Sequence, residues 1–374
     1  MKTLLRGGNV WQSGSFWNDC PIIWENEKII AVGDACQGIA VDRVIEANGM
    51  RVLPGLVDVH THGRAGYDFG TATEEQMKEI KLDYARHGVT SVFATLASGT
   101  AEEWHRAIAS IQACGYDGIH LEGNFLNPAK KGAHAPSLIV SPDASVLESF
   151  LEEIHIPCHI SAAYELDTDG SFTACALQHG ATLGLAHTAA TAEQTRLALA
   201  RGVTSFTHLY NAMPPLHHRE GGPVAVAFLG GGYGELIADG MHVCPEMIAL
   251  AYKCLGADKT VLITDSMEGT GCPDGEYHIA GMPVSLKNGR AVTPDGALAG
   301  STLNLWDGVK NLMKFASVPL EDAIACATVN PARMVGIDAS VGSIAVGRRA
   351  DLLLVDDPLE INTVILCGKE LKKQ

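Results

Sequence analysis

The chain of 374 residues is 47% hydrophobic and 19% charged, which excludes an intrinsically disordered protein. Its length exceeds that of a typical single core of about 100 to 200 residues, but it fits one α/β barrel of about 250 residues with a small additional domain. The formal net charge of −16, from 27 Lys and Arg against 43 Asp and Glu, argues against nucleic-acid binding, because that function needs a concentrated basic surface.

Residues 1 to about 50 contain short β-like runs, at residues 20–24 and 28–32, and no helix signal. From Gly55 onward, apolar runs alternate with amphipathic stretches such as Glu74–His87, which is the alternation of a parallel β/α sheet. The predicted strands are residues 57–60, 89–96, 118–121, 158–162, 182–186, 205–208, 234–238 and 261–264. Eight parallel strands, each followed by a helix or a loop, predict a closed (β/α)8 TIM-type barrel.

After a helical stretch at residues 320–335, short strands return at residues 350–355 and 362–366. The two ends of the chain are therefore alike, and we expect them to pair into one small β domain that the barrel interrupts in sequence. The predicted division assigns residues 1–50 with 340–374 to the small domain and residues 51–339 to the barrel.

The N-terminus lacks a secretory h-region, and no run approaches the ~18 apolar residues of a membrane span. The ten cysteines form no C-x-x-C pair, so we interpret them as scattered reduced thiols. We therefore expect a cytoplasmic protein with no membrane partner.

Six metal-competent residues follow predicted barrel strands: His60, His62, Glu122, His187, His208 and Asp265. The C-terminal ends of barrel strands converge on one mouth, where active sites lie, so these residues are predicted to be neighbours. Four histidines with a glutamate and an aspartate suit Zn²⁺ or another divalent first-row metal.

Each of these residues alone also has a structural interpretation. The H-x-H pair can be the solvated end of a strand, and His187 or His208 alone can be a satisfied core histidine. Glu122 can pair with a cation, and Asp265 can cap a helix. Their joint occurrence at five strand ends favours the metal site. Five other histidines lie outside this pattern and are expected to be structural: His87, His105, His155, His159 and His179.

A divalent metal on this ligand set would lower the pKa of water towards ~7 and polarise a substrate carbonyl. A carboxylate beside that water can take its proton and later deliver it to a leaving amine. Asp265 is suitably placed for this role, so the residues themselves predict hydrolysis of an amide-like bond.

Longer motifs resemble one family. They are PGLVDVHTHG at residues 54–63, HLEG at 120–123, NPAKKGAH at 127–134, THLYNAM at 207–213, HHRE at 217–220, IADGMHV at 237–243, ITD at 263–265 and LAGS at 298–301. In this order they resemble the N-acetylglucosamine-6-phosphate deacetylases of the amidohydrolase superfamily, and they run through nearly the whole chain.

The resemblance implies a metal-dependent barrel with a small β-sandwich domain formed by both termini, which removes acetate from N-acetylglucosamine 6-phosphate. It implies that Glu122, His187 and His208 bind the principal metal ion and that Asp265 is the catalytic acid and base. His60 and His62 would serve a second ion, with Glu122 and Asp265 shared or nearby. Some members of the family lack this H-x-H motif and work with one ion. The expected metal is zinc, with iron, manganese or cobalt as alternatives, at one or two ions per subunit.

For the substrate, the resemblance implies contacts from Ala133 and His134 at the sugar and acetyl group, from Asn211, Ala212, Arg219 and His242 around the phosphate, and from Leu298, Ala299 and Gly300 through the backbone. Arg219 would reach the neighbouring subunit's site, so the resemblance also implies a homodimer. A guanidinium, an imidazole and backbone N–H groups can bind phosphate locally despite the net negative charge.

Two segments depart from the family pattern. The family usually has proline where Asn124 stands, and residues 160–165 (ISAAYE) replace a more typical Ala-Pro-Glu. Neither changes a metal-ligand type, but both bear on how the substrate is held. Residues 216–220 and 273–277 are also close to the galactosamine-specific relative, so the C4 epimer is the first alternative substrate.

Two other functions remain as alternatives. A cyclic-amide hydrolase normally places a carbamylated lysine on a barrel strand, and this sequence offers no lysine at a predicted strand end. A non-catalytic sugar-phosphate-binding protein on the same barrel would usually have lost a ligand or the acid/base, whereas all of them are present here.

Overall fold

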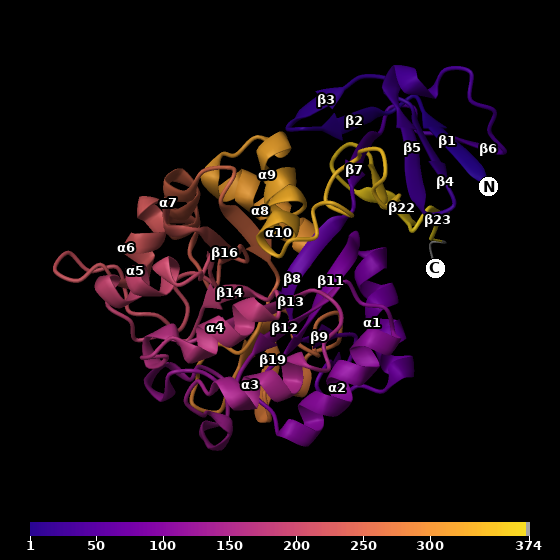
Figure 1. The fold of residues 1–374 in the computed structure, drawn as a ribbon. Coiled ribbons are helices and arrows are strands. Elements are labelled where there is room, and N and C mark those ends of the chain that lie inside the picture. The colour runs from indigo at the N-terminus through magenta and orange to yellow at the C-terminus, as the bar shows by residue number, and fades with distance from the viewer. Residues whose placement is uncertain (372–374) are drawn as a thin grey trace.

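A computed structural model describes residues 1–371, and its centre is an eight-stranded parallel sheet rolled into a nearly closed barrel (Figure 1). The strands lie side by side in chain order: β8 Leu56–Thr61, β11 Val89–Leu96, β12 Gly118–Glu122, β13 Cys158–Ala162, β14 Thr182–Leu185, β15 Ser205–Phe206, β16 Tyr233–Ile237 and β17 Thr260–Ile263. All eight predicted strands are present, and the prediction of a (β/α)8 barrel is confirmed.

The barrel closes between its last and first strands at their C-terminal ends. The N–H of Asp265, just after β17, donates to the carbonyl of His60 at 2.9 Å. The N–H of His62 donates to the carbonyl of Ser266 at 2.8 Å. These two backbone hydrogen bonds hold the H-x-H motif against the residues that follow β17.

The barrel helices lie outside the sheet: α1 Glu74–Arg86, α2 Ala101–Ala113, α3 Ala144–Leu151, α4 Ser171–Gln178, α5 Ala192–Ala200, α6 Gly222–Val226, α7 Pro245–Leu255, α8 Leu305–Ala316, α9 Leu320–Cys326 and α10 Val329–Met334. Thr73, Thr100 and Thr191 each form a capping box with a Gln or Glu three residues later, which fixes where α1, α2 and α5 begin. No helix within residues 1–371 is long and apolar enough to cross a membrane.

Alternation along the strands separates two environments, as β12 shows. Ile119 and Leu121 belong to the large apolar cluster that packs the helices onto the sheet. His120, between them, instead contacts a side chain of the next strand, with its Nε2 2.7 Å from Ser161 Oγ. Successive side chains of a strand point to opposite faces, so His120 and Glu122 both lie on the inner face of the barrel.

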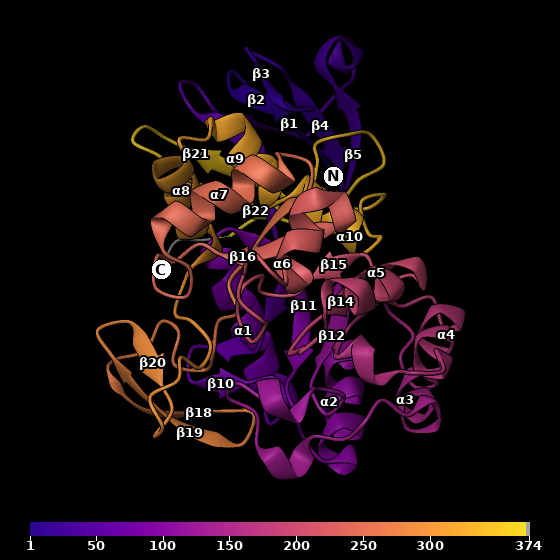
Figure 2. The same cartoon turned by 90° about the vertical axis from the view of Figure 1, so that its left-hand side faces the viewer.

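The two ends of the chain build sheets beside the barrel (Figures 1 and 2). One sheet has four strands, β1 Lys2–Arg6, β4 Ile22–Glu25, β5 Lys28–Val32 and β6 Arg43–Glu46. The other has six, β2 Asn9–Gln12, β3 Ser15–Trp17, β7 Arg51–Pro54, β21 Leu352–Val355, β22 Ile361–Leu366 and β23 Lys369–Glu370. In it, β7 pairs antiparallel with β21 and so joins both ends of the chain. The domain limits at residues 50 and 340 stay a prediction, and residues 372–374 lie outside the described part.

A three-stranded sheet that was not predicted lies at the opposite end from the terminal sheets (Figure 2): β18 Gly275–Ile279, β19 Met282–Lys287 and β20 Arg290–Val292. The signal for it was present in the sequence. Asn288 and Gly289 connect β19 to β20 with φ of 50° and 74°, which is the left-handed pair that a tight hairpin needs. A second small hairpin, β9 Gly63–Arg64 with β10 Tyr67–Asp68, follows the H-x-H motif.

Candidate active site

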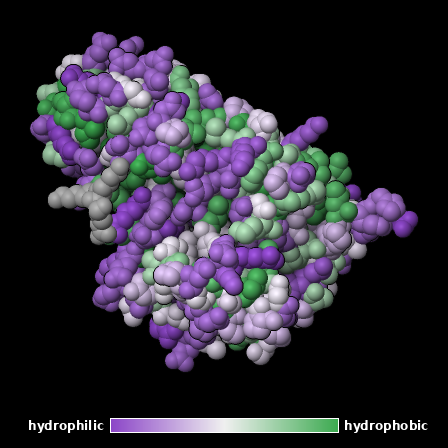
Figure 3. All heavy atoms as spheres, turned by 180° about the vertical axis from the view of Figure 1, so that it is seen from behind, coloured by the Kyte–Doolittle hydropathy of each residue, from purple (hydrophilic) through white to green (hydrophobic). Residues whose placement is uncertain are grey.

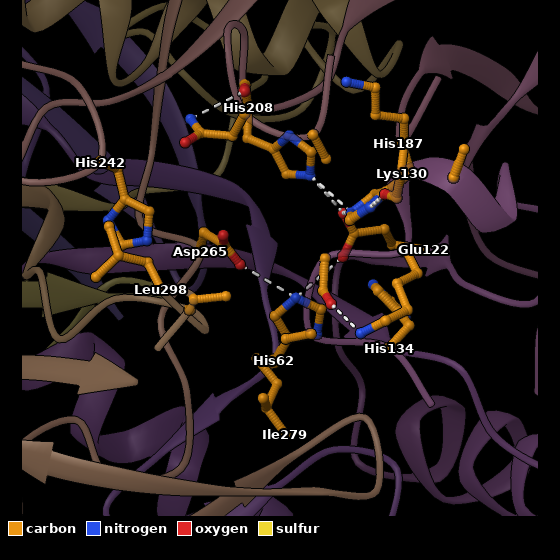
Figure 4. Close-up of a pocket in the computed structure, with 18 residues that line it drawn as sticks. His62, Glu122, Lys130, His134, His187, His208, His242, Asp265, Ile279 and Leu298 are labelled. Carbon is orange, nitrogen blue, oxygen red and sulfur yellow. Dashed lines mark hydrogen bonds and ion pairs between the residues drawn. The ribbon is translucent and has the colours of Figure 1, made fainter. Parts of the chain in front are cut away.

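A cavity of about 490 Å³ opens at the C-terminal ends of the barrel strands. Five of the six predicted metal-competent residues line it: His62, Glu122, His187, His208 and Asp265. Figure 4 shows these side chains, from five different strand ends, converging on one central space. The sixth, His60, lies directly beneath them and is fully buried. The structure therefore brings all six residues together, as the strand-end pattern predicted.

Glu122 divides its two carboxylate oxygens between two pairs of histidines. Oε1 lies 2.8 Å from His208 Nε2 and 3.3 Å from His187 Nε2. Oε2 lies 3.1 Å from His62 Nε2 and 3.2 Å from His60 Nε2. Glu122 thus forms one group of possible ligands with His60 and His62 and another with His187 and His208. Within each group the possible ligand atoms lie within 4.8 Å of one another. Each oxygen of Glu122 therefore belongs to one of two groups of residues that could hold a metal ion.

The ring nitrogens are oriented for a cation. His187 Nδ1 lies 2.7 Å from the carbonyl of Lys130, and a carbonyl only accepts, so Nδ1 carries the hydrogen and Nε2 of the neutral ring presents a lone pair. That Nε2 lies 3.1 Å from His208 Nε2 and faces the same carboxylate oxygen of Glu122. The buried His60 Nε2 has no hydrogen-bond partner within residues 1–371. Such converging acceptors repel one another without a cation, so these residues fit a divalent metal ion.

The ionisation of the site residues also favours a bound cation. Burial lowers the pKa of His62, but hydrogen bonds to Asp265 and Glu122 outweigh it and raise that pKa to about 9. Burial raises the pKa of Asp265, but the neighbouring His60 and His62 lower it to about 2. His60, His187 and His208 likewise outweigh burial and hold the pKa of Glu122 well below its ordinary value. The acids are carboxylates at neutral pH, and a metal ion supplies the positive charge that protons supply without it.

The backbone at three of the strand ends is left-handed. His187, His208 and Asp265 have φ values of 41°, 32° and 49°. For a residue with a side chain this conformation costs on the order of 1 kcal/mol, and such residues concentrate at functional sites. The chain thus turns sharply at each strand end and leaves the functional side chain at the barrel mouth.

Most of the predicted substrate residues also line the cavity: Ala133, His134, Asn211, Ala212, His242, Leu298 and Gly300. Ala299, between two of them, is buried with 1% exposure. Arg219 lies apart from the cavity, in an exposed loop just before α6. That loop projects from the barrel in Figure 1 and forms the hydrophilic protrusion in Figure 3. Its expected contribution to a neighbouring subunit's site stays a prediction.

His134 is held in one protonation state. Ser98 N–H lies 3.4 Å from His134 Nδ1 and can only donate to it, and Ser98 Oγ lies 2.8 Å from the same atom. Burial, which is the largest cause, lowers the pKa of His134 to about 3, so the ring is neutral. Since Nδ1 accepts, Nε2 carries the hydrogen, and His134 presents a hydrogen-bond donor to the cavity.

Asn124, the departure from the family pattern, supports this arrangement. Its N–H donates to Ser98 Oγ at 3.0 Å, and its side chain exchanges hydrogen bonds of 3.1 and 2.9 Å with the backbone of Gly99. Its φ is 55°, which proline cannot adopt. Asn124 therefore fastens the loop that carries Ser98 to the residues after Glu122.

Several site residues were missed from the sequence. Ser98 follows β11 without a distinctive neighbour. Lys130 and Lys131 line the cavity, although only Ala133 and His134 of their motif were expected to contact the substrate. Glu235 was visible as a lone charge within an apolar strand and is fully buried inside the barrel. His159, expected to be a structural histidine outside the metal site, lies 3.6 Å from Glu235.

Comparison with known proteins agrees with this geometry. A profile of the amidohydrolase family matches residues 51–371. The N-acetylglucosamine-6-phosphate deacetylase of Vibrio furnissii is 32% identical over 373 residues, which cover 97% of this chain and 92% of that protein. The N-acetylgalactosamine-6-phosphate deacetylase of Escherichia coli O157:H7 is 33% identical over 363 residues, which cover 92% of this chain and 95% of that protein.

A solved structure gives the same result. The N-acetyl-D-glucosamine-6-phosphate deacetylase of Mycobacterium smegmatis, a mutant in complex with N-acetyl-D-glucosamine-6-phosphate, superimposes with a TM-score of 0.90 at 30% identity. The match covers 99% of both chains, so it includes the terminal sheets as well as the barrel.

Proposed function

This chain belongs to the amidohydrolase family and is a hydrolase, and from that premise we propose that it removes the acetyl group of N-acetylglucosamine 6-phosphate to give glucosamine 6-phosphate and acetate. The observation that carries the proposal is Glu122, whose two oxygens each face a pair of histidines with Asp265 beside one pair. Similarity to deacetylases over nearly the whole chain supplies the substrate class.

Glu122, His187 and His208 would hold the principal metal ion, and His60 and His62 with the other Glu122 oxygen would hold a second. When bound, a divalent ion lowers the pKa of water and polarises the acetyl carbonyl. Zinc is the proposed metal because imidazole and carboxylate are its usual ligands, and iron, manganese and cobalt suit the same atoms.

The chemical step needs a group that moves a proton, and Asp265 is the proposed one. Its carboxylate takes a proton from water as the water oxygen bonds to the acetyl carbon. The carbon–nitrogen bond then breaks, and Asp265 delivers the proton to the leaving amine nitrogen. The free amine and acetic acid result, and the acid loses its proton to solvent to become acetate. His134, with its hydrogen on Nε2, donates a hydrogen bond to an acceptor oxygen of the substrate.

The phosphate is proposed to lie at the other end of the cavity, near Asn211, Ala212 and His242. Asp239 Oδ2 lies 2.6 Å from His242 Nδ1, and although burial lowers the pKa of His242, this carboxylate raises it above its ordinary value, which favours a positive charge for phosphate. Arg219 of a neighbouring subunit would complete the site in a homodimer. A cytoplasmic location is part of the same proposal.

The galacto epimer is the second candidate substrate. The observation that favours it is the 33% identity to the N-acetylgalactosamine-6-phosphate deacetylase of Escherichia coli O157:H7. The N-acetylglucosamine-6-phosphate deacetylase of Bacillus subtilis is also 33% identical to this chain.

The test is a paired assay of acetate release from N-acetylglucosamine 6-phosphate and N-acetylgalactosamine 6-phosphate, with protein loaded separately with Zn²⁺, Fe²⁺, Mn²⁺ and Co²⁺. We expect faster turnover of the gluco compound. Faster turnover of the galacto compound would transfer the assignment to that substrate, and cleavage of neither would overturn the proposed function.

A further inference from the structure

We propose that Glu235 is a positioning residue for the second metal ion, because its carboxylate contacts Nδ1 of His60 while Nε2 of the same ring faces Glu122. The inference concerns a residue outside the ligand sets assigned above. It rests on the proposed metal site, but it is tested by metal binding and not by acetate release.

Glu235 lies on β16, on the inner face of the barrel, and is 0% exposed. Its Oε2 lies 3.2 Å from His60 Nδ1. Its Oε1 lies 3.6 Å from His159 Nε2, which is too long for a hydrogen bond but within ion-pair distance. Glutamate is almost never fully buried unless it is paired, and within residues 1–371 its ion-pair partners are these two histidines.

The contact determines which nitrogen of His60 can bind a metal. An ionised carboxylate only accepts hydrogen bonds, so His60 Nδ1 must donate its hydrogen to Glu235. In the neutral ring, the lone pair is then on Nε2. That atom is buried, lies 3.2 Å from Glu122 Oε2, and has no hydrogen-bond partner within residues 1–371. Glu235 thus sets the tautomer and the ring orientation that a metal ligand requires.

The surrounding layer is shaped to hold this carboxylate. The second ring that contacts Glu235, His159, is fixed at its other nitrogen by Thr182 Oγ1 at 2.9 Å. Gly184 leaves room for that ring, since a Cβ at this position would lie 2.9 Å from His159 Nε2. His120, which is also buried in this layer, binds hydroxyl groups of Thr95 and Ser161 instead. The carboxylate of Glu235 therefore faces His60 and His159. Of these two rings, His60 is the one that lies beside Glu122 and Asp265 at the barrel mouth.

Carboxylates behind metal-ligating histidines make the ring more basic, and removing them typically weakens metal binding about 10- to 100-fold. Because Glu235 contacts His60 and none of His187, His208 or Glu122, its effect falls on the second ion alone. The presence of Glu235 thus supports metal binding by His60 and His62.

The main experiment measures Zn²⁺ bound by the full-length Glu235→Gln protein, by equilibrium dialysis with metal analysis. We expect two ions per chain in the wild-type protein. In the variant, the tighter ion should remain unchanged and the second should bind about 10- to 100-fold more weakly. Unchanged affinity for the second ion in Glu235→Gln, or a wild-type protein that binds only one ion, would overturn the proposal.

A matched control removes a different buried carboxylate. Asp167 is 3% exposed and accepts from the N–H groups of Phe172 and Thr173 at 3.2 and 3.0 Å, at the start of α4. Asp167→Asn should lower stability yet leave both ions bound as in the wild type. Equal loss of the second ion in Asp167→Asn would show that general loosening, and not Glu235, explains the result.

Two further measurements separate positioning from packing. In a His60→Ala background, Glu235→Gln should cause no additional loss of metal affinity, and an additional loss would contradict action through His60. If Glu235→Gln does not fold, ¹⁵N-histidine spectra of the Zn²⁺-loaded wild type decide the question: the proposal requires His60 protonated at Nδ1, and a proton on Nε2 would overturn it. Failure of acetate release with both ions bound would instead count only against the proposed function.

Discussion

On β12, the outward Ile119 and Leu121 pack helices onto the barrel, while the inward His120 and Glu122 contact other polar side chains. The inner face of a typical barrel is filled by bulky branched residues, whereas here histidines and hydroxyls occupy much of the layer under the mouth. Buried apolar groups stabilise a fold without direction, but buried polar groups cost stability unless each finds a partner. The apolar outer face of the barrel sheet therefore stabilises the fold, and the polar inner face orients the side chains of the active site.

The largest effect should come from the inner face, in Asp265→Asn. The amide cannot take a proton from water, so turnover of the acetylated sugar phosphate should fall about 10²- to 10⁴-fold. Metal at Glu122, His187 and His208 should remain, because Asp265 contacts the other pair of histidines. Acetate release and metal content measure the two results, and turnover within tenfold of wild type would refute the assigned role.

The matching change on the outer face is Leu121→Ala, one residue before Glu122. Leu121 is 1% exposed in the apolar cluster, so the free energy of unfolding should drop by about 2 to 5 kcal/mol. Turnover at a temperature where the variant is folded should stay within a few-fold of wild type. Urea unfolding measures the loss, with the 36%-exposed Leu250→Ala as a control that should change little. A large drop in turnover with unchanged stability would contradict the division between the faces.

A smaller effect should appear as pH dependence in the metal-free protein. His62 has a pKa of about 9 in the folded state against an ordinary 6.5. Its stabilising contribution is therefore complete below pH 6.5 and is lost as the pH rises through 9, by on the order of 3 kcal/mol. The difference in unfolding free energy between wild type and His62→Gln isolates this contribution. Saturating Zn²⁺ should abolish the dependence, and a flat difference in the metal-free proteins would contradict it.

The smallest effect concerns the rim of the cavity. Ser98→Ala removes the hydroxyl that contacts His134 Nδ1, and one hydrogen bond of about 1 kcal/mol corresponds to roughly a fivefold loss in kcat/KM. Metal content should not change. Ser149→Ala is the control and should leave kcat/KM unchanged, because this exposed serine of α3 donates to the carbonyl of Val146 in its own helix. Identical kinetics for both variants would mean that Ser98 does not position His134.

The sequence allowed the convergence of the metal-competent residues to be predicted, because the barrel gives each strand the same simple pattern. An apolar run followed by a metal-competent residue marks a strand end, and this located His187, His208 and Asp265 correctly. Glu235 was not predicted to belong to the site, because it lies within its strand and no local feature of the sequence shows which histidine it will contact. Ser98 escaped because its partner, His134, stands 36 residues away in an irregular loop.

The sequence by itself determined the barrel and the family, since the barrel depends on short-range periodicity and the family on motifs in a fixed order. Only the tertiary structure decided how Glu122 divides its oxygens, which ring nitrogens carry hydrogen, and that Glu235 supports His60. The physical reason is closure of the barrel. His60 and Glu235 lie on strands near opposite edges of the sheet. They come within hydrogen-bond distance only because the sheet curls into a barrel.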